Sequence, residues 1–210
     1  MQENLAKNKF TVLGIGGSLR KGSYNRALLR AAQELMPEEM DIQIFENATL
    51  SAIPLFNEDV RQLGDPEPVQ TLKKQIRQAD ALLFSIPEYN YSISGVLKNA
   101  IDWVSRPPAD SPLDGKPVAL MGTSTGISGT IRAQMHFRQV CTFTNMLPLN
   151  KPQIFVANAA MKFDPEGRLI DKDTRTFVRS LLQALLDWTR RLHYGSLMVE
   201  AQNHAVGTGK

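Results

Sequence analysis

Short apolar runs alternate with amphipathic helical patterns along most of this chain, and no other feature limits its fold as strongly. The run at 10–15 is apolar and bounded by glycines, as expected for a buried parallel strand. Ser23 then precedes a segment that places Leu28, Ala31 and Leu35 on one helical face. The same reasoning predicts five strands, at 10–15, 41–45, 81–86, 117–121 and 154–157, and five helices, at 24–36, 69–79, 96–104, 131–145 and 174–193.

This alternation predicts an α/β fold in which a parallel sheet of five strands is covered by helices on both faces. Right-handed crossovers make a doubly wound sandwich the default arrangement. Because ligands bind such sheets outside the carboxyl ends of the strands, chemistry is expected in the loops after the first, third and fourth strands. The 210-residue length suits one domain, 1–194, and the loss of periodicity predicts a frayed, flexible tail at 195–210.

Composition excludes several other classes of protein. Hydrophobic residues make up 42% of the chain and charged residues 21%, which is the balance of a globular protein rather than a disordered one. The single cysteine, Cys141, excludes an internal disulfide and is expected to be a small buried hydrophobe. Because His136, His193 and His204 lack metal-ligand spacing, no metal is predicted. A net charge of +3 without a dense basic run argues against nucleic acid.

The chain also lacks the signals of a membrane or secreted protein. No apolar run approaches the 18 or so residues that a membrane span needs. The polar segment 1–10 has no hydrophobic region of a secretion signal. Together these features predict a cytoplasmic location.

The first loop, GIGGSLRKGSYN at 14–25, combines glycines, hydroxyls and one guanidinium. A dinucleotide fingerprint needs a glycine where Leu19 stands, and a P-loop needs a lysine where Ser23 stands, so both motifs fail. What remains is a helix N-terminus with neutral donors on Ser18, Ser23 and Asn25 and a phosphate-binding fork on Arg20. This chemistry suits a terminal monophosphate without magnesium. The alternative is that Ser23 only caps the helix and the glycines only form the turn.

The second loop, PEYNYSISG at 87–95, follows the third strand and opens a helix. Pro87 stiffens the strand exit, Tyr89 and Tyr91 offer flat apolar surface, and Asn90 offers hydrogen bonds. A planar ring with polar edges would suit this loop. The alternative is a capped turn whose tyrosines cover the end of the sheet.

The third loop, GTSTG at 122–126, has the G-x-S-x-G pattern of a hydrolase nucleophile elbow between a strand and a helix. Its serine is Ser124. An acid followed by a histidine in triad order is also available, from Asp164, Asp171, Asp173 or Asp187 and then His193 or His204. The other interpretation is a loop of small residues that lets a ligand ring approach the backbone. The pattern is common by chance and leaves the first two loops unexplained.

Two of these segments, GSLRKGSYN at 17–25 and PEYNYSISGVLKNAIDW at 87–103, together resemble the flavodoxin-like NAD(P)H-dependent FMN reductases, and most closely the bacterial chromate or quinone reductases. The resemblance covers roughly 9–193 and implies strand order 2-1-3-4-5 with noncovalent FMN at the switch point. By position, it implies phosphate contacts from Ser18, Arg20, Ser23 and Asn25. It implies isoalloxazine contacts from Pro87, Glu88, Tyr89 and Asn90, with Ser124 and its neighbours closing the other side.

The resemblance implies that flavin takes a hydride from NAD(P)H and passes electrons to a quinone, free flavin or another small oxidant such as chromate. No catalytic side chain is predicted, because the protein would contribute binding and orientation. A flavodoxin-type electron carrier is the first alternative, although such carriers are typically acidic and this chain is basic. A serine hydrolase that uses Ser124 is the second alternative.

A homodimer or homotetramer is expected for two reasons. The resemblance implies flavin sites near subunit contacts. The predicted helix 96–104 also carries Leu97, Ile101, Trp103 and Val104, which is more apolar surface than one sheet contact needs. One departure concerns Gln153 after Lys151-Pro152, where relatives often carry an acid, so an intersubunit ion pair at this point is in doubt.

Overall fold

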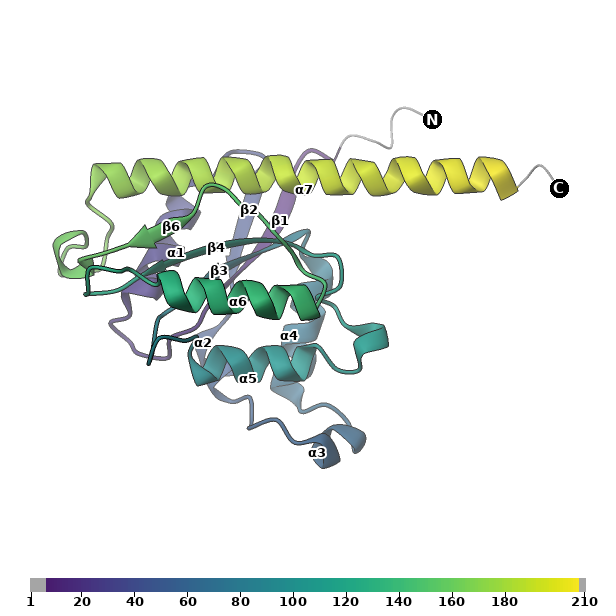
Figure 1. The fold of residues 1–210 in the computed structure, drawn as a ribbon, viewed down its shortest axis with the longest axis horizontal. Coiled ribbons are helices and arrows are strands. Elements are labelled where there is room, and N and C mark those ends of the chain that lie inside the picture. The colour runs from purple at the N-terminus through teal and green to yellow at the C-terminus, as the bar shows by residue number, and fades with distance from the viewer. Residues whose placement is uncertain (1–6, 208–210) are drawn as a thin grey trace.

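The computed structural model describes residues 7–207, in which six strands form one parallel sheet (Figure 1). The order is β2-β1-β3-β4-β5, and β6 also pairs with β4. The strands are β1 Phe10–Gly16, β2 Met40–Ile44, β3 Ala81–Ser85, β4 Pro117–Thr123, β5 Leu147–Pro148 and β6 Ile154–Val156. The predicted flavodoxin-like, doubly wound parallel sheet with order 2-1-3-4-5 is therefore confirmed.

The fifth position of the sheet is filled by two short strands instead of one. β5 pairs with the start of β4, where Leu147 lies beside Pro117, and β6 pairs with its end, where Ile154 lies beside Met121. The sequence predicts only the second piece, 154–157. A two-residue strand that ends at a proline has no periodic signal, so Leu147–Pro148 could not be found in this way.

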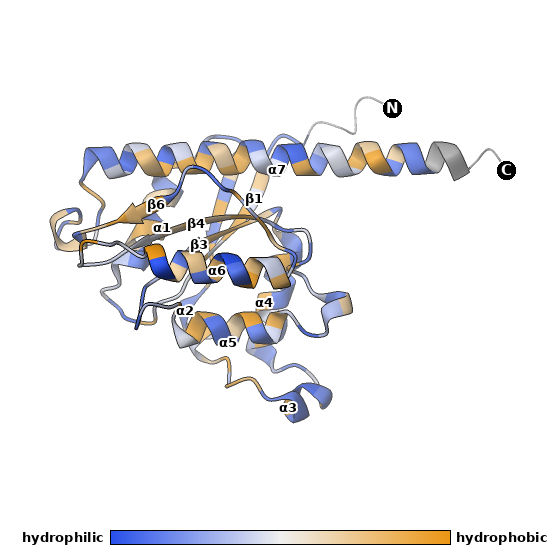
Figure 2. Cartoon of the chain, in the orientation of Figure 1, coloured by the Kyte–Doolittle hydropathy of each residue, from blue (hydrophilic) through white to orange (hydrophobic). Residues whose placement is uncertain are grey.

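Helices cover both faces of the sheet, with α1 and α7 on one face and α4, α5 and α6 on the other (Figure 1). The α-helices are α1 Tyr24–Leu35, α2 Asn47–Ser51, α3 Glu58–Gln62, α4 Glu67–Gln78, α5 Gly95–Val104, α6 Ile131–Phe143 and α7 Lys172–Gly207. Two 3₁₀ turns are η2 Pro108–Asp110 and η3 Ala159–Met161. Orange and blue alternate along α7 in Figure 2, as expected for a helix that buries only one face.

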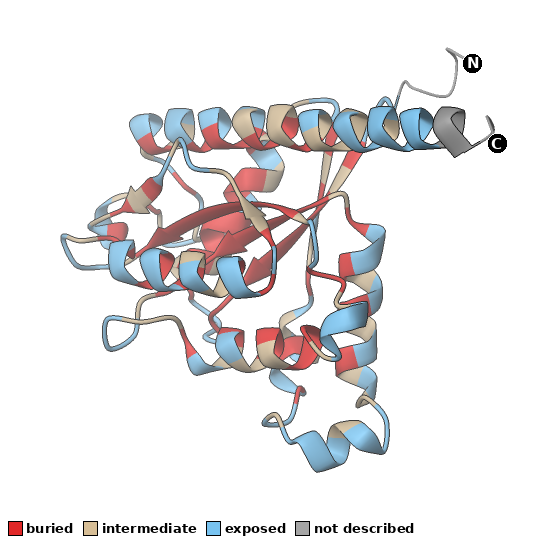
Figure 3. Ribbon diagram, turned by 45° about the vertical axis from the view of Figure 1, so that its right-hand side comes forward, coloured by how far each residue is buried: buried red, intermediate tan, exposed pale blue. Residues whose placement is uncertain are grey.

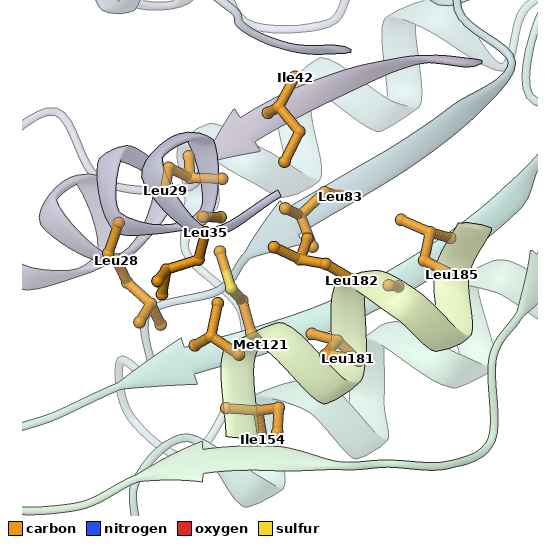
Figure 4. Close-up of a cluster of buried hydrophobic side chains, with 14 of the residues drawn as sticks. Leu28, Leu29, Leu35, Ile42, Leu83, Met121, Ile154, Leu181, Leu182 and Leu185 are labelled. Carbon is orange, nitrogen blue, oxygen red and sulfur yellow. The ribbon is translucent and has the colours of Figure 1, made fainter. Parts of the chain in front are cut away.

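The two-residue period of the strands separates the core into two clusters. Leu83 and Met121 face α1 and α7, whereas their neighbours Leu82 and Leu120 face α4, α5 and α6. The central strands are buried along their whole length, as the red arrows of Figure 3 show. Figure 4 shows side chains of α1 and α7 meeting those of the strands in the first cluster. Burying one such aliphatic side chain completely stabilises the folded state by about 1.5–3 kcal/mol relative to leaving it exposed.

The apolar surface of α5 is used inside the chain and not left for a partner. Trp103 and Val104 are fully buried. The indole N–H of Trp103 donates to the carbonyl of Pro54 at 2.8 Å, and its ring lies edge-on against Phe56 with centroids 5.1 Å apart. The segment between β2 and α4 therefore covers the second apolar face of α5. The apolar residues counted as surplus are buried within the chain, so they do not support a subunit contact. The covering loop could not be predicted from the helix alone.

Helix α7 extends beyond the point where a frayed tail is predicted. The structure continues it to Gly207, and residues 208–210 lie outside the described part of the chain. Leu181 and Leu185 pack into the core, but Met198 and Val199 are exposed, and this end of the helix is mostly pale blue in Figure 3. Loss of an apolar period therefore marks the end of packing against the domain, not the end of the helix.

Cys141 lies in α6 and is buried, as predicted. Burial raises the pKa of its thiol to about 12, so the reactive thiolate does not form near neutral pH. Within residues 7–207, no three His, Cys, Asp or Glu side chains are grouped closely enough to hold a metal ion. No helix in this part of the chain has the length and apolarity needed to cross a membrane.

Candidate functional site

The loops after β1, β3 and β4 meet at the carboxyl edge of the sheet and enclose a cavity of about 430 Å³. This is the edge toward which the strand arrows point in Figure 3. Eight of the nine site residues predicted from sequence line the cavity: Ser18, Arg20, Ser23, Asn25, Pro87, Glu88, Tyr89 and Ser124. The ninth, Asn90, does not line it. Tyr24, Thr123 and Thr125 complete the lining.

Two glycines allow the three loops to approach one another. A Cβ on Gly17 would lie 2.8 Å from the Cδ of Pro87, and the hydroxyl of Ser94 donates to the Gly17 carbonyl at 2.6 Å. A Cβ on Gly122 would lie 2.5 Å from the carbonyl oxygen of Ile86. The first loop therefore contacts the second loop at Gly17, and the end of β4 contacts it at Gly122.

Asn25 joins all three loops by hydrogen bonds between protein groups. Its Oδ1 accepts the N–H of Thr123 at 3.0 Å and the hydroxyl of Ser85 at 3.1 Å, and its Nδ2 donates to the Thr123 carbonyl at 2.9 Å. Asn25 is buried, and only one of its amide hydrogens has no partner in the described residues. Its side chain is therefore mainly a clamp between α1, β3 and β4.

The loop after β1 leaves its other polar groups without partners. The N–H groups of residues 18–22, Tyr24 and Asn25 donate to no acceptor in the described part of the chain. Arg20 is exposed, forms no ion pair with a described residue, and has its guanidinium 5.9 Å from the Tyr24 ring centroid. Ser18 is buried beside it. Of these residues, Ser18, Arg20, Tyr24 and Asn25 line one end of the cavity, so their unpaired donors are available to a ligand there.

Ser23 fits both predictions made for it. Its Oγ accepts the N–H of Arg26 at 3.4 Å, so it caps α1. The hydroxyl hydrogen of a capping serine is still free to donate to a ligand. The cap and the ligand contact are therefore compatible.

The arrangement favours an anion on electrostatic grounds. The N-terminus of α1 and the Arg20 guanidinium both place positive charge at this end of the cavity. Glu88 is the one carboxylate in the lining, and it pairs with Arg132. The Oγ1 of Thr123 is buried without a partner among the described residues, which is the kind of group that a bound ligand completes. The residues present therefore fit the terminal phosphate of FMN.

The loop after β3 forms a tight hairpin. Tyr89 N–H donates to the Ser92 carbonyl at 3.0 Å, and Ser92 N–H donates back at 2.9 Å. Asn90 and Tyr91 occupy the two central positions with φ of 50° and 63°. Asparagine tolerates this left-handed backbone better than most residues, so Asn90 forms the turn. Asn90 is therefore not part of the cavity lining, and its contact with the flavin ring stays a prediction.

Glu88 turns its carboxylate toward α6. One oxygen, Oε2, accepts the backbone N–H groups of Arg132 at 3.0 Å and Ala133 at 3.3 Å, and Oε1 accepts from the Arg132 guanidinium at 2.8 Å. The residue at the N-cap position, Thr130, forms no side-chain cap. Glu88 therefore caps a helix that has no cap of its own.

Ser124 lacks the surroundings of a nucleophile. Its Oγ has one contact in the described residues, 3.4 Å to the Gly126 carbonyl. His136 contacts Ser92 instead, and His193 packs against Phe10 at the start of β1. The side chain of His204 lies outside the described residues. Of the acids in triad order, Asp171 binds Thr174 and Lys162, and Asp164 binds Arg168. The geometry therefore gives no support to a nucleophile elbow.

Sequence reasoning missed the residues that act between segments. Thr123 and Thr125, the neighbours of Ser124, were implied by the resemblance and do line the cavity. Arg132 and His136 are 44 residues from the hairpin groups they contact, and no local pattern connects them.

Comparison with known proteins gives a consistent result. A family model described as NADPH-dependent FMN reductase matches residues 10–161. An NAD(P)H-dependent FMN reductase of Pseudomonas aeruginosa is 54% identical over 181 residues, which cover 86% of this chain and 96% of the relative. A quinone reductase of Escherichia coli is 40% identical over 186 residues, which cover 88% of this chain and 97% of the relative.

A solved structure agrees with the sequence comparisons. FerB, a flavoenzyme NAD(P)H:(acceptor) oxidoreductase of Paracoccus denitrificans, has a TM-score of 0.79 and 32% identity to this chain. The match covers 87% of this chain and 98% of FerB. The resemblance inferred from the two loop motifs is confirmed, and the chain belongs to the NADPH-dependent FMN reductase family.

Proposed function

We propose that the chain is an FMN-dependent oxidoreductase that passes electrons from NAD(P)H to quinones. One observation carries the proposal: a cradle of unpaired donors stands at the carboxyl edge of the sheet, where this fold binds its ligands. Family membership supports FMN as the cofactor and NAD(P)H as the co-substrate. Bound FMN supplies the redox chemistry, because it takes a hydride from the nicotinamide and passes electrons to a second substrate.

The loop after β1 would hold the phosphate of FMN. Ser18 and Ser23 donate through their hydroxyls, Arg20 supplies the guanidinium, and the free backbone N–H groups of 18–22 supply the rest. Asn25 contributes mainly through its hold on Thr123 and Ser85. Because the one carboxylate in the cavity lining, Glu88, pairs with Arg132, its repulsion of a bound phosphate is reduced.

The loops after β3 and β4 would hold the isoalloxazine. Pro87 and Tyr89 offer rigid apolar surface on one side, and Ser124 offers a hydroxyl and a nearby backbone on the other. Glu88 and Asn90, which were predicted as ring contacts, shape this wall through the cap and the turn. None of these side chains is positioned as an acid–base pair, so the protein binds and orients the ring.

Quinones are the acceptor class that the relatives favour. Besides the Escherichia coli enzyme, a 2-hydroxy-1,4-benzoquinone reductase of a Burkholderia species is 37% identical over 174 residues. The exposed ring of Tyr89 offers a flat apolar surface in the cavity lining for such a molecule. Free flavin and chromate remain predicted acceptors.

Steady-state oxidation of NADH and NADPH by the FMN-loaded protein tests this function. We expect turnover with 1,4-benzoquinone in the absence of any other protein, followed at 340 nm. Flavin that stays oxidised after NAD(P)H addition, but is reduced by a separate reductase, would instead identify an electron carrier. Replacing the quinone by FMN or chromate in the same assay ranks the remaining acceptors.

We further propose that the enzyme is a cytoplasmic homodimer or homotetramer. Exposed Tyr91, Ile127 and Ile131 on and near the loops that build the cavity support a contact between copies at this end of the molecule. Light scattering at micromolar concentration tests it, and a mass of one chain would exclude it.

A further inference from the structure

The hairpin after β3 is attached to the first turns of α6 by three contacts. The first is the Glu88 cap, which engages Arg132 and Ala133. The second places the Arg132 guanidinium 4.0 Å from the centroid of the Tyr91 ring. The third joins the Oγ of Ser92 to Nδ1 of His136 at 3.0 Å. A short, solvent-exposed turn is thus held along its whole length.

The turn needs such support because its backbone is unfavourable. Tyr91 has a φ of 63°, in the left-handed region that a bulky residue rarely occupies. A residue in this conformation keeps it only where its surroundings hold it there. The guanidinium over the Tyr91 ring supplies that hold, and the same guanidinium is fixed by Glu88. Glu88 and Arg132 therefore act as one unit.

The held segment is also a wall of the cavity. Pro87, Glu88 and Tyr89 line it, yet the Glu88 side chain is only 10% exposed and both of its oxygens accept hydrogen bonds from α6. A carboxylate bound in this way is turned toward α6 and not toward a molecule in the cavity. Tyr89, by contrast, lines the cavity and is half-exposed, so its ring is accessible to a second substrate.

We propose that Glu88 is a positioning residue that acts through Arg132 to fix the Tyr89 wall for the electron acceptor. The proposal rests on the quinone reductase function given above. Because the phosphate cradle belongs to another loop, loosening the hairpin changes the acceptor side of the cavity more than FMN binding.

Hydrogen exchange of the FMN-loaded protein tests the clamp without any assay of activity. In Glu88→Ala, the amides of Arg132 and Ala133 lose their acceptor, and we expect them to exchange at least about tenfold faster. Glu88→Gln keeps a carbonyl oxygen for these amides, so it should restore part of the protection. Unchanged exchange in Glu88→Ala would overturn the proposal.

Kinetics test the role in the reaction. We expect Glu88→Ala and Arg132→Ala each to raise KM for 1,4-benzoquinone by roughly five- to twentyfold, with kcat and FMN affinity within about threefold. The KM of Glu88→Gln for 1,4-benzoquinone should lie between the values of the wild type and Glu88→Ala. The double variant, with both Glu88→Ala and Arg132→Ala, should have a KM no higher than that of the more affected single variant, because both changes break the same unit. Lys98→Ala, which breaks an exposed ion pair with Asp102 on α5, is the matched control. It should leave KM, kcat and FMN affinity unchanged.

Three results would overturn the positioning role. One is a hundredfold loss of kcat in Glu88→Gln with Arg132→Ala unaffected, which would make Glu88 an acid in the reaction. Another is a double variant in which the KM increases of Glu88→Ala and Arg132→Ala multiply, as independent effects do. The last is loss of FMN with an unchanged KM for the quinone.

If Glu88→Ala does not fold, Glu88→Gln and Arg132→Ala carry the same comparison. If the wild type reduces no quinone, the proposed function fails, while hydrogen exchange still decides whether the clamp exists.

Discussion

The loop after β1 and the loop after β3 line the same cavity but treat their polar groups in opposite ways. In the first loop, Arg20 and a run of backbone N–H groups have no partner in the described residues. In the second, Glu88, Tyr89 and Ser92 form hydrogen bonds to one another or to α6. Because part of the first loop lines the cavity at the carboxyl edge of the sheet, its unpaired donors mark where an anionic ligand is expected. The paired loop is built to keep its shape.

Arg20→Ala should have the largest effect of the changes that probe this contrast. A charge-assisted phosphate contact is worth roughly 1.5–3 kcal/mol, so FMN affinity should fall by about 10- to 150-fold. Riboflavin, which lacks the phosphate, should bind the variant and the wild type equally. Fluorescence titration of the apoprotein measures both, and an equal loss for the two flavins would show that Arg20 does not contact the phosphate.

Gly17→Ala tests the contact between the two loops. Its Cβ would come within 2.8 Å of Pro87, so one wall must move. We expect a loss of about 1–3 kcal/mol in the free energy of unfolding, measured by urea denaturation. Gly22→Ala in the same loop is the matched control, because an added Cβ there meets no atom within 4 Å. Equal stability of the two variants would mean that the loops do not touch at Gly17.

Asn25→Ala separates a clamp from a phosphate ligand. The substitution leaves Thr123 and Ser85 without their partner, so the spacing of the loops should relax. Affinity for FMN and for riboflavin should then fall together, by roughly tenfold. A loss confined to FMN would identify Asn25 as a phosphate ligand, as the sequence predicts.

Ser124→Ala should have the smallest effect. A hydroxyl that contacts the flavin supplies one neutral hydrogen bond, worth roughly 0.5–1.5 kcal/mol. Bound flavin should therefore be retained, and quinone reductase activity should stay within about tenfold. Stoichiometric labelling of wild-type Ser124 by a fluorophosphonate, together with esterase activity that the variant lacks, would contradict this view and restore the nucleophile.

These contrasts also explain how much could be predicted from the sequence. The strand order follows from the alternation of strands and helices, and Ser18, Arg20 and Ser23 follow from a local glycine-rich turn. Asn25 was predicted as a site residue because it lies in the same loop. Its hydrogen-bond partners Ser85 and Thr123 could not be predicted, since they lie 60 and 98 residues away. Contacts of this range depend on how the sheet assembles, and no local pattern reports them. For the same reason the cap that Glu88 places on α6 could not be predicted, whereas its contact with the flavin ring stays a prediction.

The relative affinity of the wild-type apoprotein for FMN and riboflavin tests the central claim most directly. The two ligands share the ring system and differ at the phosphate, so their ratio measures what the unpaired donors of the loop after β1 contribute. We expect FMN to bind at least about a hundredfold more tightly, since Arg20, two hydroxyls and several backbone N–H groups lie in this loop. Equal affinities would contradict it and place the phosphate site elsewhere.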